Sequence, residues 1–138
     1  MDLSDATPFL TEHNQAVIVT VGQEEVPHAS NVMTHFDGEI FRVSLTSDRV
    51  KTHNLQRRPL AVLHLTSADF WKWVAVECDA ELTPVTTRAG DAVGEELRDL
   101  YEDIRGGDSA PEDFLQSMVD ANRLVLRLTP RRVYGQLG

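Results

Sequence analysis

Short β-branched or alternating segments, each bounded by a turn, recur along this chain and most constrain its fold. Ala16–Val21 has the composition of a buried strand. Asp37-Gly38 is a strong hairpin turn between two extended segments, His28–Phe36 and Glu39–Leu45. Hairpins of this kind join antiparallel neighbours. Further strands are predicted over Leu60–Leu65, Trp71–Leu82 and Leu124–Leu128, the last continued by Val133–Gln136 past Pro130.

Helical signals are fewer. Thr7 suits a helix cap and Pro8 a first helical position, which predicts a short helix to about His13. A basic helix follows Ser44 and ends before Pro59. Two more helices are predicted from apolar residues at helical spacing: one over 93–104, ended by Gly106-Gly107, and one with Pro111 in its first turn and with Ser109 and Glu112 at capping-box spacing.

Six predicted strands and a few helices place the chain in the α+β class, mainly β, and predict a closed or nearly closed antiparallel barrel. Residues 1–138 have the size of one domain. Side chains fill the interior of so small a barrel, so a ligand has to bind on its outside or at a subunit boundary. We therefore expect a dimer.

The net charge is −9, and it is unevenly distributed. Twelve Asp and Glu against three Arg between Glu77 and Asp113 also sum to −9, so the remainder of the chain is close to neutral. Nucleic-acid binding needs a broad basic face, which this chain lacks. The acidic stretch is expected to form a solvated helical surface.

Other classes of protein are disfavoured by what the sequence omits. No apolar run approaches the roughly 20 residues that cross a bilayer, and the N-terminus lacks a signal-peptide pattern. Membrane partners are therefore not expected, and the cytoplasm is the simplest location. Cys78 is the only cysteine and lies on the apolar side of its strand, as an inert core residue would. His28, His35, His53 and His64 lie on different elements without Cys or carboxylate at ligand spacing, so no metal site is expected.

The segment Ser44–Pro59 reverses the local sign of charge. Arg49, Lys51, Arg57 and Arg58 lie within ten positions where a predicted strand opens into the basic helix. Free backbone N–H groups at a helix start, with hydroxyls and cations beside them, favour a phosphate group. Arg57 and Arg58 come at the helix end, where cations complement the helix dipole, so they are expected to be structural.

Five motifs occur in order along nearly the whole chain: Pro27-His28-Ala29-Ser30-Asn31-Val32, Phe36-Asp37-Gly38, Ser44-(x)4-Arg49-Val50-Lys51-Thr52-x-Asn54-Leu55-x-Arg57-x-Pro59-x-Ala61, Trp71-x-Trp73-(x)3-Glu77 and Arg132-Val133-Tyr134-Gly135. Together they resemble the pyridoxamine-phosphate-oxidase-like split β-barrels that bind FMN. Within that superfamily the chain most resembles the actinobacterial branch that uses the deazaflavin coenzyme F-420.

The resemblance implies a homodimer with two cofactors in the grooves between its subunits. It implies that Arg49, Lys51 and Thr52 hold the cofactor phosphate, and that Trp71 or Trp73 reaches the cofactor of the other subunit. From the residues alone, core or dimer packing is an equal alternative for both tryptophans. The residues assigned to the cofactor are Ser30, Asn31, Val32, Met33, Ser44, Arg49, Lys51, Thr52 and Trp73.

No catalytic acid, base or nucleophile is identified. Ser30 lacks nucleophile-elbow glycines and a paired base. A cofactor that carries the chemistry removes the need for such groups. The resemblance thus implies an oxidoreductase that binds reduced F-420 and passes a hydride to an unsaturated small-molecule substrate. FMN in the same fold, or a non-catalytic protein that stores or delivers the cofactor, are the alternatives.

The acidic stretch bears on the choice of cofactor. F-420 carries an anionic glutamyl tail, which nearby carboxylates would repel if they faced the groove. We expect the carboxylates of residues 91–113 to face outward, away from the basic helix. If these helices bordered the cofactor groove, FMN would be favoured, because it lacks that tail.

Overall fold

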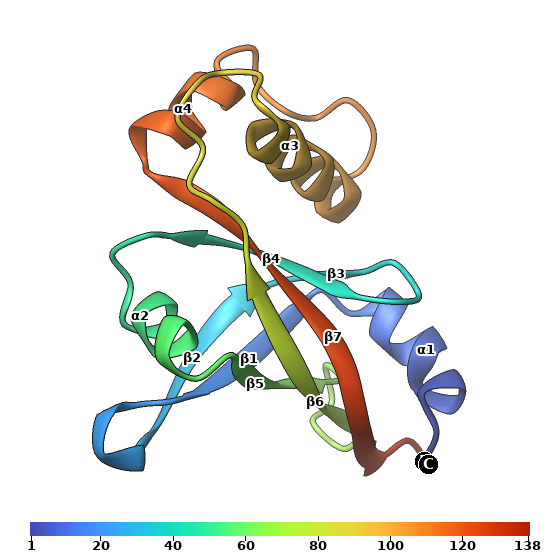
Figure 1. Cartoon of the computed structure of the whole chain (residues 1–138). Helices are drawn as coiled ribbons and strands as arrows, with labels where there is room; N and C mark the ends of the chain where they lie inside the picture. Colours follow the sequence, from blue (N-terminus) through green and yellow to red (C-terminus); the bar gives the residue numbers. More distant parts are fainter.

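The computed structural model describes every residue, Met1–Gly138, and consists of one sheet and the helices around it (Figure 1). The elements are α1 (Leu3–Glu12), β1 (Gln15–Val21), the short 3-10 helix η1 (Gln23–Glu25), β2 (Pro27–Met33), β3 (His35–Phe36), β4 (Phe41–Thr46), α2 (Val50–Arg57), β5 (Leu60–Thr66), β6 (Trp73–Leu82), α3 (Ala92–Arg105), α4 (Phe114–Asp120) and β7 (Arg123–Gln136).

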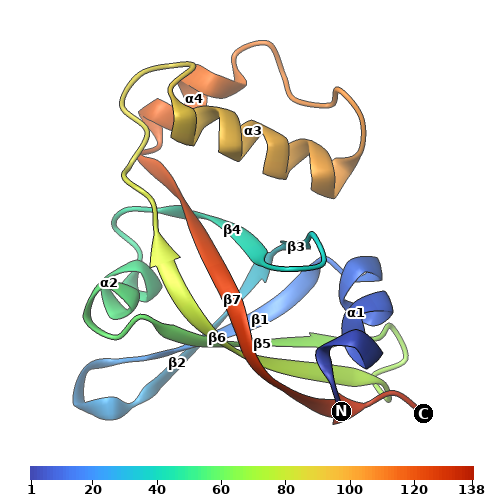
Figure 2. The same cartoon turned by 45° about the vertical axis from the view of Figure 1, so that its right-hand side comes forward.

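All seven strands form one antiparallel sheet in the order β2-β1-β5-β6-β7-β4-β3. Strands β2 and β3 lie at opposite edges of this sheet, yet only Thr34 separates them in sequence. The sheet therefore has to curl until its two edges approach each other, and it forms a half-barrel (Figures 1 and 2). The predicted α+β class and antiparallel barrel-like sheet are confirmed.

The predicted number of six strands is wrong, because the extended segment 28–36 breaks at Thr34. The Thr34 N–H donates to the carbonyl of Asn14 at 2.8 Å, and its hydroxyl donates to the carbonyl of Arg42 at 3.0 Å. Thr34 thus bonds to residues near both edges of the sheet. The chain changes from one edge to the other at this residue, which divides the segment into β2 and β3.

The interior of the half-barrel is filled. A core of 19 buried residues occupies it, and Phe41, Val43 and Leu45 point inward from β4 as their alternation predicts. Leu124 and Leu126 do the same from β7. Any ligand of appreciable size therefore binds outside this core.

Helices α3 and α4 form a separate layer between β6 and β7 in sequence, outside the half-barrel (Figure 2). They have a small core of their own, in which Leu97 and Phe114 pack on Val125 of β7. Val125 is buried on the outer side of its strand for this reason, between the inward-facing Leu124 and Leu126. No helix of the chain has the length and apolar character to cross a membrane.

The first helix begins earlier than predicted. It starts at Leu3, and Pro8 lies inside it on an exposed position. The Asp5 carboxylate accepts a hydrogen bond of 2.9 Å from the N–H of Asp2, which satisfies one of the free donors at a helix start. The cap that Thr7 was expected to provide is therefore supplied five residues earlier.

The predicted capping box of α4 is also wrong. The helix starts at Phe114 with Asp113 as its N-cap residue, and the N–H of Phe114 donates to the carbonyl of Pro111 at 3.0 Å. Ser109 and Glu112 thus precede the helix and do not cap it. The turn around Pro111 takes the place of the first helical turn that the spacing predicts.

The closing strand does continue past Pro130, as a single strand. Pro130 lies opposite Cys78, and the register between β6 and β7 shifts between Glu77 and Cys78. Proline has no N–H to donate, and it is tolerated at a bulge because the hydrogen bonds between the two strands are interrupted there. Cys78 is buried as predicted, and burial raises the pKa of its thiol to about 12.

Candidate functional site: a cationic pocket with one apolar wall

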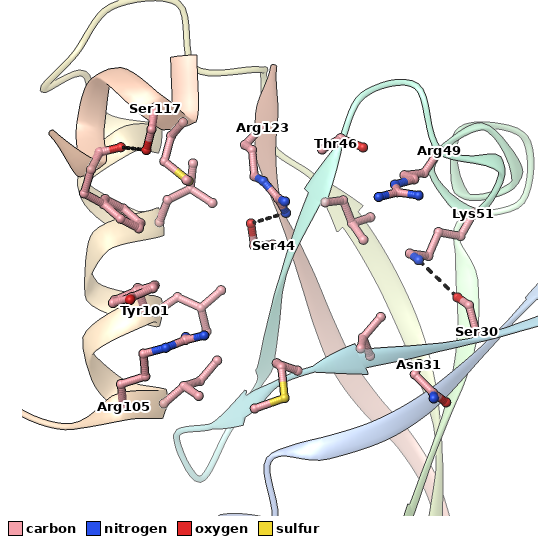
Figure 3. Close-up of a pocket in the computed structure, with 18 of the residues that line it drawn as sticks. Ser30, Asn31, Ser44, Thr46, Arg49, Lys51, Tyr101, Arg105, Ser117 and Arg123 are labelled. Atoms are coloured by element: carbon pink, nitrogen blue, oxygen red, sulfur yellow. Dashed lines mark hydrogen bonds between the residues drawn. The ribbon is translucent and has the colours of Figure 1, made fainter. Parts of the chain in front are cut away.

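A pocket of about 740 Å³ lies outside the half-barrel, between the sheet and the α3–α4 layer. One side consists of β2, the end of β4 and the start of α2, and the opposite side consists of α3 and α4 (Figure 3). Both the size and the mixed lining are typical of a site for a cofactor or substrate. Most of the predicted cofactor residues line it: Ser30, Asn31, Val32, Met33, Ser44, Arg49 and Lys51.

The start of α2 supplies the features of an anion site. Arg49 is its N-cap residue, and the first intrahelical bond runs from the N–H of His53 to the carbonyl of Arg49 at 3.1 Å. The N–H groups of residues 50–52 therefore have no partner inside the helix. A helix start of this kind, flanked by cations, favours a phosphate group.

The cations of the pocket have no acidic counterparts. Lys51 donates only to the hydroxyl of Ser30, at 3.1 Å, and Arg123 only to the hydroxyl of Ser44, also at 3.1 Å. Arg49 forms no ion pair, and no Asp or Glu lines the pocket. In a chain with a net charge of −9, this is a local concentration of unbalanced positive charge.

The pKa values of Lys51 and Arg123 reflect their burial and the closeness of the other cations. Partial burial lowers the pKa of Lys51, and the neighbouring Arg49 and Arg123 lower it further. Burial also lowers the pKa of Arg123, with Arg49 as the second cause. An anion bound among these groups would relieve both effects, because it replaces lost solvation and offsets the repulsion.

The opposite side of the pocket is an apolar wall. Arg105 also lines the pocket there, with its guanidinium 4.1 Å from the centre of the Tyr101 ring. The wall is formed by Leu97, Leu100, Tyr101 and Ile104 from α3 and by Phe114 and Met118 from α4.

The position of α3 and α4 bears on the choice of cofactor. Both helices border the pocket, which is the arrangement that we expected to favour FMN. The carboxylates themselves are absent from the lining, because α3 turns its apolar face and Arg105 toward the pocket. The lining therefore agrees with the expected outward orientation of the carboxylates.

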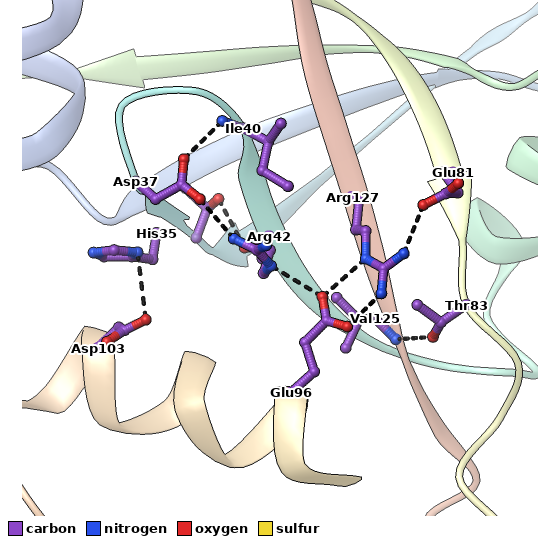
Figure 4. Close-up of polar contacts among 11 residues, drawn as sticks. His35, Asp37, Ile40, Arg42, Glu81, Thr83, Glu96, Asp103, Val125 and Arg127 are labelled. Carbon is purple, nitrogen blue, oxygen red and sulfur yellow. Dashed lines mark hydrogen bonds and ion pairs between the residues drawn. The ribbon is translucent and has the colours of Figure 1, made fainter. Parts of the chain in front are cut away.

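A network of ion pairs fixes α3 on the sheet (Figure 4). Glu96 accepts hydrogen bonds from Arg42 of β4 at 2.9 Å and from Arg127 of β7 at 2.5 and 2.9 Å. The bonds from Arg127 are the main cause of a lowered pKa of Glu96, and the bond from Arg42 lowers this pKa further. Arg42 also pairs with Asp37 and Arg127 with Glu81, so the network holds the wall over both strands.

Two predicted cofactor residues lie elsewhere. Thr52 is fully buried and does not line the pocket, and its hydroxyl donates to the carbonyl of Thr46 at 2.8 Å. Trp73 stacks on His64 with ring centres 5.1 Å apart, outside the pocket. Trp71 precedes β6 in a loop and is 72% exposed. The proposed contact of either tryptophan with a partner's cofactor stays a prediction.

Sequence reasoning missed Arg123 and the apolar wall. Arg123 is 74 residues from Arg49 in sequence and begins a strand whose pairing with β4 (Thr46 opposite Arg123) brings it to the pocket. The wall residues have the helical spacing of a buried face, a pattern that predicts a helix but does not identify what its apolar face contacts. Their pairing with the sheet depends on the folded topology and has no local signal.

Cations, hydroxyls and free N–H groups line this pocket without a carboxylate or an imidazole. Such a site can bind an anionic group and orient a ring beside it, and it has few groups for acid–base chemistry. The lining fits a phosphorylated cofactor that carries its own chemistry. No cluster of three or more His, Cys, Asp or Glu side chains that could bind a metal occurs in the structure.

Comparison with known proteins agrees with this assignment of the fold. A family model described as pyridoxamine 5'-phosphate oxidase matches residues 5–137. Among solved structures, an F420 reductase has a TM-score of 0.69 and 21% identity over 91% of this chain and 94% of its own. A conserved hypothetical protein from Mycobacterium tuberculosis has a TM-score of 0.72 and 22% identity over 99% of this chain and 84% of its own.

The same fold also occurs in a heme storage protein from Vibrio cholerae. Its TM-score is 0.68, with 14% identity over 99% of this chain and 96% of its own. At such identities the three structures establish a common fold. Proteins that share this fold therefore differ in what they bind.

Proposed function

The chain belongs to the pyridoxamine 5'-phosphate oxidase family, and on this premise we propose that it is an oxidoreductase that holds coenzyme F-420 in the cationic pocket. Its reaction would be the transfer of a hydride to an unsaturated organic substrate. The observation that carries the proposal is a set of cations without acidic partners at the open start of α2.

The residues have separate parts in this proposal. Arg49 and Lys51, with the free N–H groups of residues 50 and 51, would hold the phosphate. The strand Ser30–Met33 would line the ring system, and Ser44 would lie beside it. The bound cofactor supplies the hydride chemistry. The protein contributes position, exclusion of water by the apolar wall and a positive potential at the phosphate.

FMN is the first alternative, because it shares the ribityl-phosphate arm. The position of α3 and α4 beside the pocket favours FMN, as the glutamyl tail of F-420 would have to leave past an acidic layer. The repulsion that we expected depends on carboxylates that face the groove, however, and none lines it. We therefore keep F-420 as the proposal and FMN as the alternative.

A non-catalytic carrier of the cofactor is the second alternative. The lack of carboxylate and imidazole groups in the lining favours it, since a carrier needs none. The heme storage protein with the same fold shows that storage occurs on this scaffold. A carrier and an enzyme differ in one measurable respect, which is turnover.

Titration of the purified apoprotein with each cofactor tests the proposal. We expect saturable binding of F-420, followed by the anisotropy of its own fluorescence and by calorimetry. Binding of FMN with no binding of F-420 would transfer the assignment to FMN. Binding of neither would refute the proposal.

A second assay separates the enzyme from the carrier. Reduced cofactor is mixed with the protein and a panel of enones and quinones, and its reoxidation is followed by absorbance. An enzyme oxidises it in a substrate-dependent way. Saturable binding without reoxidation by any member of the panel would favour the carrier.

We also propose a homodimer in the cytoplasm. The exposed Trp71, the adjacent Phe70 (75% exposed) and the half-buried Trp73 form an aromatic region that a second subunit would cover. In that arrangement Trp73 of one subunit would approach the cofactor of the other. Light scattering of the purified protein gives the subunit number, and a monomer would refute the tryptophan assignment.

A further inference from the structure

Three residues of β7 point outward beneath the α3–α4 layer, and two of them are arginines. One arginine forms ion pairs with carboxylates, and the other has no acidic partner. Arg123, Val125 and Arg127 lie opposite Thr46, Ser44 and Arg42 of β4. Arg127 pairs with Glu96 and Glu81, and Arg42 pairs with Glu96 and Asp37.

Arg123 has a hydroxyl, Ser44 Oγ, as its sole hydrogen-bond partner. Partly buried guanidinium groups normally have a carboxylate or another acceptor, because loss of water is costly. The donors of Arg123 that remain free are thus available to a ligand.

Arg123 also lies at the boundary between the two halves of the pocket. Figure 3 shows its guanidinium over Ser44, with Arg49 and Lys51 on one side and the wall of α3 and α4 on the other. A phosphate at the start of α2 would contact Arg49 and Lys51 first. A group that contacts Arg123 can instead rest its body on the apolar wall.

We propose that Arg123, with the Ser44 hydroxyl, is an oxyanion site for the substrate, and that the substrate is an apolar α,β-unsaturated carbonyl compound. Its carbonyl oxygen accepts from the guanidinium, and its apolar body packs on the wall that Leu100, Tyr101 and Ile104 provide. The substrate class rests on the proposed function; the oxyanion site itself rests on the geometry of the chain.

The chemistry explains the need for a cation at this point. A hydride with its two electrons adds to the β-carbon of the enone, and the C=C electron pair moves so that negative charge collects on the carbonyl oxygen. Arg123 stabilises that charge. A proton from water then adds to the α-carbon, which gives the saturated carbonyl compound. The reduced cofactor of the proposed function is the electron donor and is oxidised by two electrons.

The first experiment uses apoprotein and 4-nitrophenol, whose anion mimics an oxygen that bears negative charge on an apolar ring. We expect the anion to bind, with its absorption band reporting the ionised form. Arg123→Ala should weaken this binding by about 10- to 100-fold, the range for hydrogen bonds to charged groups. Arg88→Ala is the matched control, because Arg88 is exposed and outside the pocket.

The second experiment uses protein loaded with cofactor and 4-phenyl-3-buten-2-one. Arg123→Ala should lower kcat/KM by about 100-fold, as loss of one oxyanion donor does, while the cofactor dissociation constant stays unchanged. Added guanidinium should restore part of the rate. The wall predicts a strong preference for this substrate over 3-buten-2-one, which lacks the phenyl ring. Arg123→Lys, which keeps the charge, serves if the alanine variant does not fold.

The outcomes are distinguishable. If Arg123→Ala weakens cofactor binding as much as Lys51→Ala does and leaves 4-nitrophenolate binding unchanged, Arg123 is a phosphate ligand and the inference is wrong, although the proposed function stands. If the protein binds neither cofactor but still binds 4-nitrophenolate through Arg123, the proposed function fails and the oxyanion site remains. Equal kcat/KM for the two ketones would refute the apolar substrate class.

Discussion

Lys51 Nζ donates to Ser30 Oγ at 3.1 Å and thereby connects the first turn of α2 to the middle of β2. The two residues are 21 positions apart, and both line the cationic pocket. The bond holds the lysine ammonium over the strand that is proposed to line the cofactor ring.

Lys51→Ala should weaken cofactor binding by about 1.5–3 kcal/mol, the scale of hydrogen bonds to charged groups. The matched control is Lys72→Ala, since Lys72 is the only other lysine and is exposed outside the pocket. Calorimetric titration of both variants measures the difference. Equal dissociation constants for the two variants would remove Lys51 from the phosphate site.

The pH dependence of the same interaction has a definite sign. Burial, with Arg49 and Arg123, lowers the pKa of Lys51 from its ordinary value of 10.5, so its positive charge is lost at a lower pH than usual. Cofactor affinity should therefore fall as pH rises toward 10.5. Lys51→Arg should flatten this decline, because arginine does not titrate there. A decline of equal steepness in the arginine variant would show that another group causes it.

Thr52→Val should lower the free energy of unfolding by about 1–2 kcal/mol, because it leaves the carbonyl of Thr46 without its hydroxyl donor. Cofactor affinity should stay unchanged, since the buried hydroxyl does not reach the pocket. Urea unfolding and calorimetry give the two quantities. Thr11→Val on the exposed face of α1 is the control and should have little effect on stability. Weakened cofactor binding by Thr52→Val would reinstate the side chain as a phosphate ligand.

Glu96→Gln should lower the free energy of unfolding by about 1–2 kcal/mol after allowance for solvent screening of its partners. The pKa of Glu96 is lowered in the folded state, so its stabilisation is complete above its ordinary pKa of 4.5 and is lost as pH falls through the folded value. The stability difference between wild type and variant should accordingly shrink at acid pH. Glu95→Gln, which affects only a partly exposed pair with Arg98 on α3, is the control. A difference that does not vary with pH would mean that the charge of Glu96 is not the cause.

Gly135→Ala should destabilise the protein by about 1–3 kcal/mol, the range for overpacking. A Cβ at this position would lie 2.2 Å from the carbonyl oxygen of Trp73 on the paired strand, which forces β6 and β7 apart. Thermal unfolding measures the effect. Gly138→Ala is a suitable control, because a Cβ there meets nothing within 4 Å. A melting temperature equal to that of the control would show that β6 and β7 adjust at no cost.

The parts of the fold that follow from local pattern could be predicted from sequence. The alternation of Phe41, Val43 and Leu45 and the hairpin at Asp37-Gly38 correspond to β4 and its turn. The start of α2 near Arg49 was likewise expected. Each of these features depends on neighbours within a few residues, so the sequence carries its signal directly.

The parts that depend on distant pairing could not be predicted. The break at Thr34 arises from its hydrogen bonds to Asn14 and Arg42. These bonds depend on the order of the strands in the sheet, which no local sequence pattern indicates. Arg123 reaches the pocket only because β7 pairs with β4. The face that α3 turns toward the pocket likewise follows from Glu96 and its two arginine partners, which lie 54 and 31 residues away.

The small core of α3 and α4 has a consequence for protein engineering. Leu97 and Phe114 pack in a cluster distinct from the 19 residues inside the half-barrel. Residues of the wall, such as Ile104 and Met118, can therefore be exchanged in libraries with little risk to the scaffold that carries Arg49 and Lys51. Under the proposed function, substrate preference and cofactor affinity become two properties that selection can alter independently.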